Sequence, residues 1–158
     1  MKIRVGFGFD VHALAVRRKM ILGGVEIPHG KGCLGHSDGD VLLHAICDAL
    51  LGAAGLNDIG HHFPDTDIRF KDADSKMLLK ECIKMVREKG YTLGNVDCTL
   101  CAELPKISPH ISAMKKVISE ILCIDPEDIS IKATTMEKLG YVGSQKGIHA
   151  YSVVLIQK

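Results

Sequence analysis

Short stretches in which apolar residues alternate with polar ones, or follow one another directly, divide the chain into predicted strands. These stretches cover residues 3–9, 20–27, 93–103, 128–134 and 148–156. Gly23 and Gly24 interrupt the second stretch, where we expect a bulge or a bend within one strand. Residues 30–40 and 56–73 are polar and rich in glycine or aspartate, and we expect both to be loops.

Three longer segments place apolar residues three and four positions apart, which is typical of helices with one face in a core. They cover about residues 38–54, 74–89 and 109–122. At the first helix, Ser37 and Asp40 resemble a capping box, and Gly55 is the expected stop. Ser108 is the expected N-cap of the third helix.

The order of these elements, β-β-α-α-β-α-β-β, predicts an α/β (α+β) fold. In it, a single layer of mixed β-sheet is packed on one face by helices. The length fits one ordinary domain, and we expect residues 1–158 to form it. The other face of the sheet then needs a cover, and oligomerisation is one way to provide it.

Composition narrows the classes of function. The formal net charge is +1 and no extended basic patch is present, so a nucleic-acid partner is not expected. No apolar run is long enough to span a membrane, and the first residues lack the apolar core of a secretory signal. We therefore expect a protein of the bacterial cytoplasm whose six cysteines are reduced and mostly buried.

The first candidate site is the pair Asp10 and His12, just past the end of the first predicted strand. Residues two apart on a strand project to the same side, so one cation can bind both. His44, on the first helix, completes a set of three protein ligands with a fourth position open, as in catalytic zinc sites. The alternative for the Asp-x-His pair is a solvated strand end.

The first predicted helix carries a polar face that favours a site. Asp40, His44 and Asp48 are spaced four apart, and residues 38–54 include no lysine, arginine or glutamate. The alternative is an exposed face, which usually carries lysine and glutamate. We expect Asp48 either to orient His44 or to lie at the rim of the site, and His36, in the preceding loop, to meet substrate.

Two further segments, 58–67 and 132–140, carry candidate binding groups. Aspartates of the first could bind hydroxyl groups of a ligand, and the alternative is a solvated, turn-rich loop. In segment 132–140, threonine hydroxyls and backbone N–H groups could bind phosphate, and Glu137 could hold Mg²⁺. The alternative there is that β-branched residues simply belong in a strand.

Six segments together resemble one family over the whole length of the chain. They read GFGFDVHAL (6–14), LGGVEIP (22–28), HSDGDVLLHAICDALLGAAGLNDIG (36–60), HFPDTD (62–67), KGYTLGNVD (89–97) and KATTMEKLG (132–140). By these segments the chain resembles the 2-C-methyl-D-erythritol 2,4-cyclodiphosphate synthases of the non-mevalonate (MEP) route to isoprenoids. The resemblance implies a homotrimer around a central channel, with an active site at each subunit interface.

The resemblance also implies a reaction. The substrate is a cytidine diphosphate ester, 4-diphosphocytidyl-2-C-methyl-D-erythritol 2-phosphate. Its 2-phosphate attacks the β-phosphate, CMP is released and a cyclic diphosphate forms, which makes the enzyme a metal-dependent phosphorus–oxygen lyase. By resemblance, one zinc ion per subunit binds to Asp10, His12 and His44. A second cation, Mg²⁺ or Mn²⁺, contacts Glu137, and the transition state is stabilised by His36 and Thr135.

The implied substrate-binding residues fall into three groups. Asp10, His12, His36 and Ser37 lie around the phosphates. The second group occupies the aspartate-rich loop, where Asp58, Gly60 and Asp65 hold the erythritol part and the others are Ile59, Phe63, Pro64, Thr66 and Asp67. The third group forms a cytidine pocket contributed by a neighbouring subunit, with Ala102, Pro105, Lys106, Thr134 and Met136, and with Thr135, Glu137 and Tyr141 also binding substrate.

At one place the chain departs from the family pattern. Ser144 stands where many relatives have an arginine that is associated with phosphate-bearing ligands near the trimer axis. Lys146 offers a point charge nearby but not a bidentate fork. Two other functions stay open: a metal-dependent phosphoester hydrolase on the same scaffold, and a non-catalytic, zinc-stabilised ligand-binding protein. The vacant fourth position of the ligand set disfavours the second.

Overall fold

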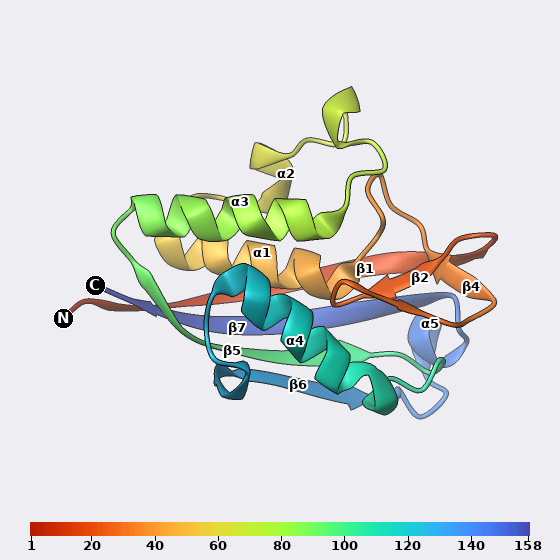
Figure 1. Ribbon diagram of the computed structural model, residues 1–158. Coiled ribbons are helices and arrows are strands. Elements are labelled where there is room, and N and C mark those ends of the chain that lie inside the picture. Colours follow the sequence, from red (N-terminus) through yellow and green to blue (C-terminus); the bar gives the residue numbers. More distant parts are fainter.

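The computed structural model describes residues 1–158, with a sheet covered on one face by three long helices (Figure 1). The strands are β1 (Ile3–Val16), β2 (Met20–Leu22), β3 (Val25–Ile27), β4 (Lys31–Cys33), β5 (Thr92–Cys101), β6 (Ile129–Thr134) and β7 (Gly147–Gln157). The helices are α1 (Val41–Ala54), α2 (Ile59–His62), α3 (Ser75–Glu88), α4 (Ile111–Leu122) and α5 (Gly140–Gly143). Single 3₁₀ turns occur at Ile68–Phe70, Ser108–His110 and Pro126–Asp128.

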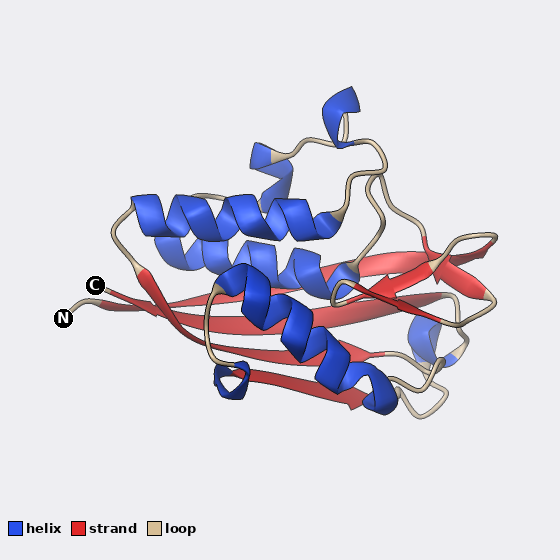
Figure 2. Cartoon of the chain, in the orientation of Figure 1, coloured by secondary structure: helices blue, strands red, loops and turns tan.

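The main sheet has the strand order β4-β1-β7-β5-β6 and is mixed. β5 and β6 run parallel, and every other neighbouring pair in this sheet is antiparallel. Parallel neighbours need a crossover connection, which α4 provides between β5 and β6. Helices α1, α3 and α4 all lie on the same side of the sheet (Figure 2), so the predicted layer arrangement is confirmed.

Helix α1 lies directly on the sheet because β1 has glycines beneath it. A Cβ atom added at Gly6 or Gly8 would come within 1.9 Å of a backbone carbonyl oxygen of α1. Every residue of α1 except Asp48 and Gly52 is buried. The lack of lysine, arginine and glutamate in this helix therefore follows from its burial, and the inference of a site from that composition is wrong. The alternative of an exposed polar face is wrong for the same reason.

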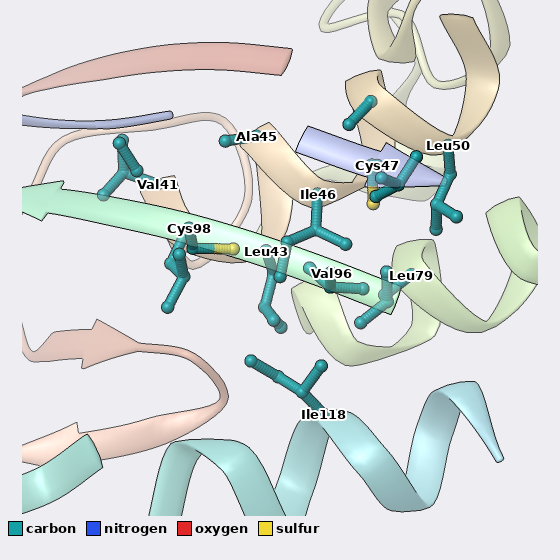
Figure 3. Close-up of a cluster of buried hydrophobic side chains, with 14 of the residues drawn as sticks. Val41, Leu43, Ala45, Ile46, Cys47, Leu50, Leu79, Val96, Cys98 and Ile118 are labelled. Atoms are coloured by element: carbon teal, nitrogen blue, oxygen red, sulfur yellow. The ribbon is translucent and has the colours of Figure 1, made fainter. Parts of the chain in front are cut away.

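The core between the helices and the sheet is mostly aliphatic (Figure 3). Leu43 of α1, Leu79 of α3 and Ile118 of α4 are fully buried, and Cys98 of β5 packs in the same cluster. All six cysteines are free thiols, and Cys123 alone is exposed. The expectation of reduced, mostly buried cysteines is confirmed.

The segment after β1 forms a hairpin outside the main sheet. β2 pairs antiparallel with β3, and Gly23 and Gly24 form the turn with φ angles of +59° and +75°. Residues other than glycine rarely adopt this left-handed backbone conformation. The prediction of one continuous strand over residues 20–27 is wrong, because the two glycines reverse the chain.

The sequence did not predict several elements of only three or four residues. Residues 30–40 contain β4, residues 56–73 contain α2 and a 3₁₀ turn, and residues 140–143 form α5. Elements of three or four residues offer too few positions for a hydrophobic period to be recognised.

The ends of the helices test the capping predictions. Gly55 stops α1 in the left-handed conformation, as expected. Asp40 is itself the N-cap of α1, since its carboxylate accepts a backbone N–H of the first turn, so the capping box formed with Ser37 is wrong. Ser108 begins a 3₁₀ turn ahead of α4 and gives that helix no side-chain cap, so its assignment as the N-cap is also wrong.

The face of the sheet opposite the helices is exposed and apolar. Val5, Phe7 and Phe9 of β1 are 63%, 62% and 41% exposed, and they lie beside Tyr151 and Val153 of β7. The rings of Phe7 and Tyr151 stack with 6.1 Å between their centroids. The prediction that helices leave one sheet face uncovered is confirmed for the single chain. No helix is both long enough and apolar enough to cross a membrane.

Candidate active site

Strand parity brings Asp10 and His12 toward α1. Even-numbered residues of this part of β1, which include Gly6 and Gly8, face the helix, while odd-numbered residues face the open side of the sheet. Asp10 and His12 therefore meet His44, which α1 presents from its second turn. Ligand atoms of the three residues all lie within 4.8 Å of one another, so this predicted cluster forms within one chain.

Asp10 is the centre of the cluster. Its Oδ2 atom lies 2.8 Å from His12 Nε2 and 3.0 Å from His44 Nδ1. Those two ring nitrogens are 3.2 Å apart. Three donors of the types that zinc prefers thus converge on one point, and the ligand set fits such an ion.

The charge state of the cluster follows from these contacts. Burial raises the pKa of Asp10, but hydrogen bonds and charge from His12 and His44 outweigh it and lower this pKa to about 2. Burial also lowers the pKa of His12, but the hydrogen bond and the charge of Asp10 outweigh it and raise the pKa overall. Asp10 is therefore ionised at neutral pH, and it attracts positive charge to this point.

The outer ring nitrogen of each histidine is anchored to the protein. His12 Nδ1 lies 2.5 Å from the Leu34 carbonyl oxygen. His44 Nε2 lies 2.8 Å from Ser75 Oγ and 3.1 Å from Ser37 Oγ. The nitrogens left to bind a cation are therefore His12 Nε2 and His44 Nδ1.

Two carboxylates that shared a predicted face with His44 have other partners. Asp40 is fully buried and accepts the backbone N–H groups of Gly23 and Gly24, at 2.9 and 2.7 Å, as well as capping α1. Asp48 accepts the Ile59 N–H at 2.7 Å and so fixes the start of α2. Asp48 therefore does not orient His44, because Ser75 and Ser37 occupy the outer nitrogen of that ring.

A cavity of about 430 Å³ opens in front of the cluster. The residues of the predicted site that line it are Asp10, His12, His36, Ser37, His44, Ile59, Gly60, Phe63, Pro64 and Asp65. Phe70 and Leu78 also line this metal-side cavity and were missed, because Leu78 belongs to the apolar stripe of α3 and reads as core. Most of the residues that line the metal-side cavity were therefore among the predicted site residues.

Three predicted residues of the aspartate-rich loop do not line the metal-side cavity. Asp58 is the N-cap of α2 and accepts the His61 N–H at 2.8 Å. The backbone oxygen of Asp67 lies 3.2 Å from His36 Nε2, and its carboxylate forms an ion pair with Arg69 at 2.6 Å. Asp58, Thr66 and Asp67 do not line the cavity, so their predicted contacts with substrate stay predictions.

A second cavity, of about 380 Å³, lies between the segment that follows β5 and the end of β6. Its lining includes the predicted Ala102, Pro105, Lys106, Thr134 and Thr135, and also Glu103, Leu104, Ile107, Ser108 and Ala133, which the sequence reading did not single out. We call it the nucleotide-side cavity, after the cytidine pocket predicted from the sequence. It shares no lining residue with the metal-side cavity. Within one chain, the two halves of the predicted site are therefore separate.

The remaining predicted residues follow β6. Met136 N donates to Glu103 Oε2 at 3.2 Å, and Thr135 Oγ1 donates to Glu137 Oε1 at 3.2 Å. Tyr141, on α5, lies outside both cavities, with its hydroxyl 2.5 Å from His149 Nδ1. Thr135, Met136, Glu137 and Tyr141 are exposed in the single chain, whereas Glu103 is half-buried and His149 is buried.

Comparison with known proteins identifies the family. A model of the YgbB family matches residues 3–157. The chain belongs to the YgbB family. A curated relative from Parabacteroides distasonis, named 2-C-methyl-D-erythritol 2,4-cyclodiphosphate synthase, is 61% identical over 158 residues, which are 100% of this chain and 98% of the relative. The resemblance noted in the sequence is thus confirmed.

Solved structures of YgbB-type chains agree with the fold. The bifunctional IspDF from Campylobacter jejuni matches with a TM-score of 0.95 and 46% identity over 98% of this chain. That match covers only 42% of the bifunctional chain. An IspF structure from Plasmodium falciparum, described as a CDP complex, matches with a TM-score of 0.86 and 39% identity, covering 98% of this chain and 95% of that one.

Proposed function

We propose that residues 1–158 form a single cyclodiphosphate synthase domain. It converts 4-diphosphocytidyl-2-C-methyl-D-erythritol 2-phosphate into 2-C-methyl-D-erythritol 2,4-cyclodiphosphate and CMP. The observation that carries this proposal is the cluster of Asp10, His12 and His44 at the wall of an open cavity, in a chain of the YgbB family. The activity named for the relative from Parabacteroides distasonis supports the same conclusion. The expected location, the cytoplasm of a bacterium, stays a prediction.

The reaction is a phosphoryl transfer within one molecule. An oxygen of the 2-phosphate forms a bond to the β-phosphorus, and the bond from that phosphorus to the α–β bridging oxygen breaks. CMP leaves with the electron pair, so the step balances without water and belongs to the lyase class. The attacking phosphate is already ionised at neutral pH, and no general base is required. The main barriers are repulsion between anions and the entropy of ring closure.

Cations address the first barrier. In this proposal Asp10, His12 and His44 hold zinc, one per subunit. A bound zinc ion supplies positive charge that polarises the β-phosphate and offsets the charge of the attacking group. Glu137 offers a carboxylate to Mg²⁺ or Mn²⁺, since such ions commonly bind one or two carboxylates together with substrate phosphates.

Positioning by the protein addresses the second barrier. His36 and Ser37, which line the metal-side cavity, hold phosphate oxygens, and His36 with Thr135 stabilises the transition state. The erythritol part lies along α2 and the loop after it, against Asp58, Ile59, Gly60, Phe63, Pro64, Asp65, Thr66 and Asp67. The cytidine occupies the nucleotide-side cavity, with Ala102, Pro105, Lys106, Thr134 and Met136 around it and with Tyr141 nearby. The similar Plasmodium falciparum protein, solved as a CDP complex, supports a cytidine nucleotide as ligand.

We further propose that three chains assemble around a central channel, with each active site at a subunit interface. Two observations support a homotrimer. The two cavities share no lining residue within one chain, which fits a substrate site built from halves of two neighbouring chains. The exposed apolar face of β1 and β7 also gives a surface for assembly.

The test is direct. Purified protein is incubated with the proposed substrate and Mg²⁺, and the products are followed by phosphorus NMR, beside the His44→Ala variant and a sample stripped of metal with chelator. We expect CMP and cyclic diphosphate in equal amounts, and neither product in the two controls. CMP together with a linear phosphate would instead indicate a hydrolase, and would overturn the cyclase assignment while leaving the metal site in place.

A further inference from the structure

A chain of hydrogen bonds leads from His44 away from the cavity into the protein. His44 Nε2 lies 2.8 Å from Ser75 Oγ, and Ser75 Oγ lies 2.5 Å from Asp38 Oδ1. Ser75 is fully buried at the start of α3, whereas Asp38 lies in the loop before α1. These hydrogen bonds therefore connect the loop before α1, α1 itself and the start of α3 behind the proposed metal site.

The direction of this chain is set by the chemistry of its members. An ionised carboxylate only accepts hydrogen bonds, so the single hydroxyl proton of Ser75 is donated to Asp38. Ser75 Oγ then faces the ring of His44 with lone pairs, and His44 Nε2 must carry the proton. His44 Nδ1, which lies 3.0 Å from Asp10 Oδ2, is then the nitrogen that gives up its proton when a metal ion binds.

Asp38 is held in place independently of any ligand. Its carboxylate also accepts the backbone N–H of Ser75 at 3.0 Å and that of Asp40 at 3.1 Å. The Asp38 N–H donates to the Ala73 carbonyl at 3.0 Å, and the Asp72 N–H donates to the His36 carbonyl at 2.7 Å. Residues 36–38 are thereby pinned to residues 72–75, and the acceptor for Ser75 has a fixed position.

Ser37 is a poorer candidate for the same role. Its Oγ lies 3.1 Å from His44 Nε2, which is longer than the contact of Ser75. No carboxylate fixes its hydroxyl proton, and Ser37 lines the metal-side cavity, where substrate competes for it. Ser75 does not line that cavity, so a ligand bound there does not compete for its hydroxyl group.

We propose that Ser75 and Asp38 are positioning residues of the metal site, which fix both the ring orientation and the proton of His44. The inference rests on the metal site proposed above, and it assigns a role to two residues that the ligand set does not include. Groups behind metal-bound histidines typically change metal affinity by about 10- to 100-fold when they are removed. We therefore expect Ser75→Ala to weaken zinc binding by about 10- to 100-fold.

The experiment measures zinc affinity by competition with a chelator, and the visible spectrum of the Co²⁺-loaded protein, in wild type, Ser75→Ala and Ser152→Ala. Ser152 is the matched control, because it is also fully buried but lies on β7 with Cys98 Sγ as its side-chain contact. We expect a weakened affinity and an altered Co²⁺ spectrum in Ser75→Ala only. Both readouts report on the metal site itself and do not depend on substrate turnover.

The outcomes separate this inference from the proposed function. If wild type binds zinc and Ser75→Ala binds within twofold of Ser152→Ala, the positioning role is overturned and the metal site stands. If wild type binds no zinc, both are overturned. Thermal unfolding of the metal-free proteins shows whether Ser75→Ala folds. If it does not, Asp38→Asn, which keeps an acceptor oxygen for Ser75, must weaken zinc binding by several-fold.

Discussion

The two cavities differ in how firmly their side chains are held. On the metal side, Asp10, His12 and His44 contact one another, and the outer ring nitrogens are tied to Leu34 and Ser75. On the nucleotide side, Ala102 and Ile107 are buried, but Lys106, Thr134 and Thr135 are exposed. The side-chain contacts of the two threonines are local, such as the one between Thr135 and Glu137.

This difference indicates where each half obtains its order. A buried network with several hydrogen bonds fixes its side chains before any ligand arrives, which suits a site that must select one cation geometry. Exposed side chains on a turn are fixed only when another surface covers them. The nucleotide side therefore depends on substrate and on the neighbouring chain proposed above.

The largest expected effect follows from removing a residue of the preorganised half. His44→Ala leaves two ligands in place of three, and we expect cyclisation to fall by about 10³-fold or more because the charge that offsets the phosphates is lost. Product formation by phosphorus NMR checks this, with circular dichroism to confirm that the variant is folded. A folded His44→Ala protein with near wild-type turnover would show that the reaction does not need a metal ion bound at His44.

Mixed assemblies test whether the two halves come from different chains. His44→Ala disables the metal side and Thr135→Ala the other side, and each variant alone is expected to be inactive. Co-expression with two different tags allows trimers that contain both variants to be purified, and in each of these about one third of the sites combine two intact halves. We expect activity to return to roughly that fraction of wild type. No recovery in trimers shown to contain both variants would place both halves within one chain.

The next effect concerns folding rather than chemistry. Asp40→Ala leaves the buried N–H groups of Gly23, Gly24 and the first turn of α1 without an acceptor. We expect it to lower the free energy of unfolding by about 3 kcal/mol, measured by urea titration of the metal-free protein at one concentration. Asp48→Ala, on the same helix but with a single N–H partner, is the control and should cost about 1 kcal/mol.

Asp40 also shows where sequence reasoning about the site failed. Its spacing from His44 is that of one helical face, but its carboxylate instead accepts the backbone N–H groups of Gly23 and Gly24, in the turn between β2 and β3. The turn at Gly23 and Gly24 that supplies these N–H groups was expected to be a bend within one strand. Because this turn was not predicted, the hydrogen-bond donors to the buried Asp40 carboxylate could not be predicted either.

The cluster of Asp10, His12 and His44, in contrast, was predictable from the sequence. Alternation along a strand places Asp10 and His12 on one side, and that geometry does not depend on the rest of the fold. The contact of Ser75 with His44 was not predictable, because a single serine at the start of a helix carries no pattern that marks it as the partner of a histidine on another helix. Periodicity gives the faces of elements, but not the pairing of individual polar atoms between them.

The smallest expected effect belongs to the exposed half. Lys106 lines the nucleotide-side cavity and is exposed, so its attraction for a cytidine nucleotide is screened by solvent. We expect Lys106→Ala to weaken binding of CDP by about 3- to 10-fold, and less at high salt, measured by isothermal titration calorimetry. Lys116→Ala, which removes an exposed lysine from α4 outside this cavity, should leave CDP binding unchanged. If the two variants weaken CDP equally, the effect is one of net charge, and the cytidine pocket lies elsewhere.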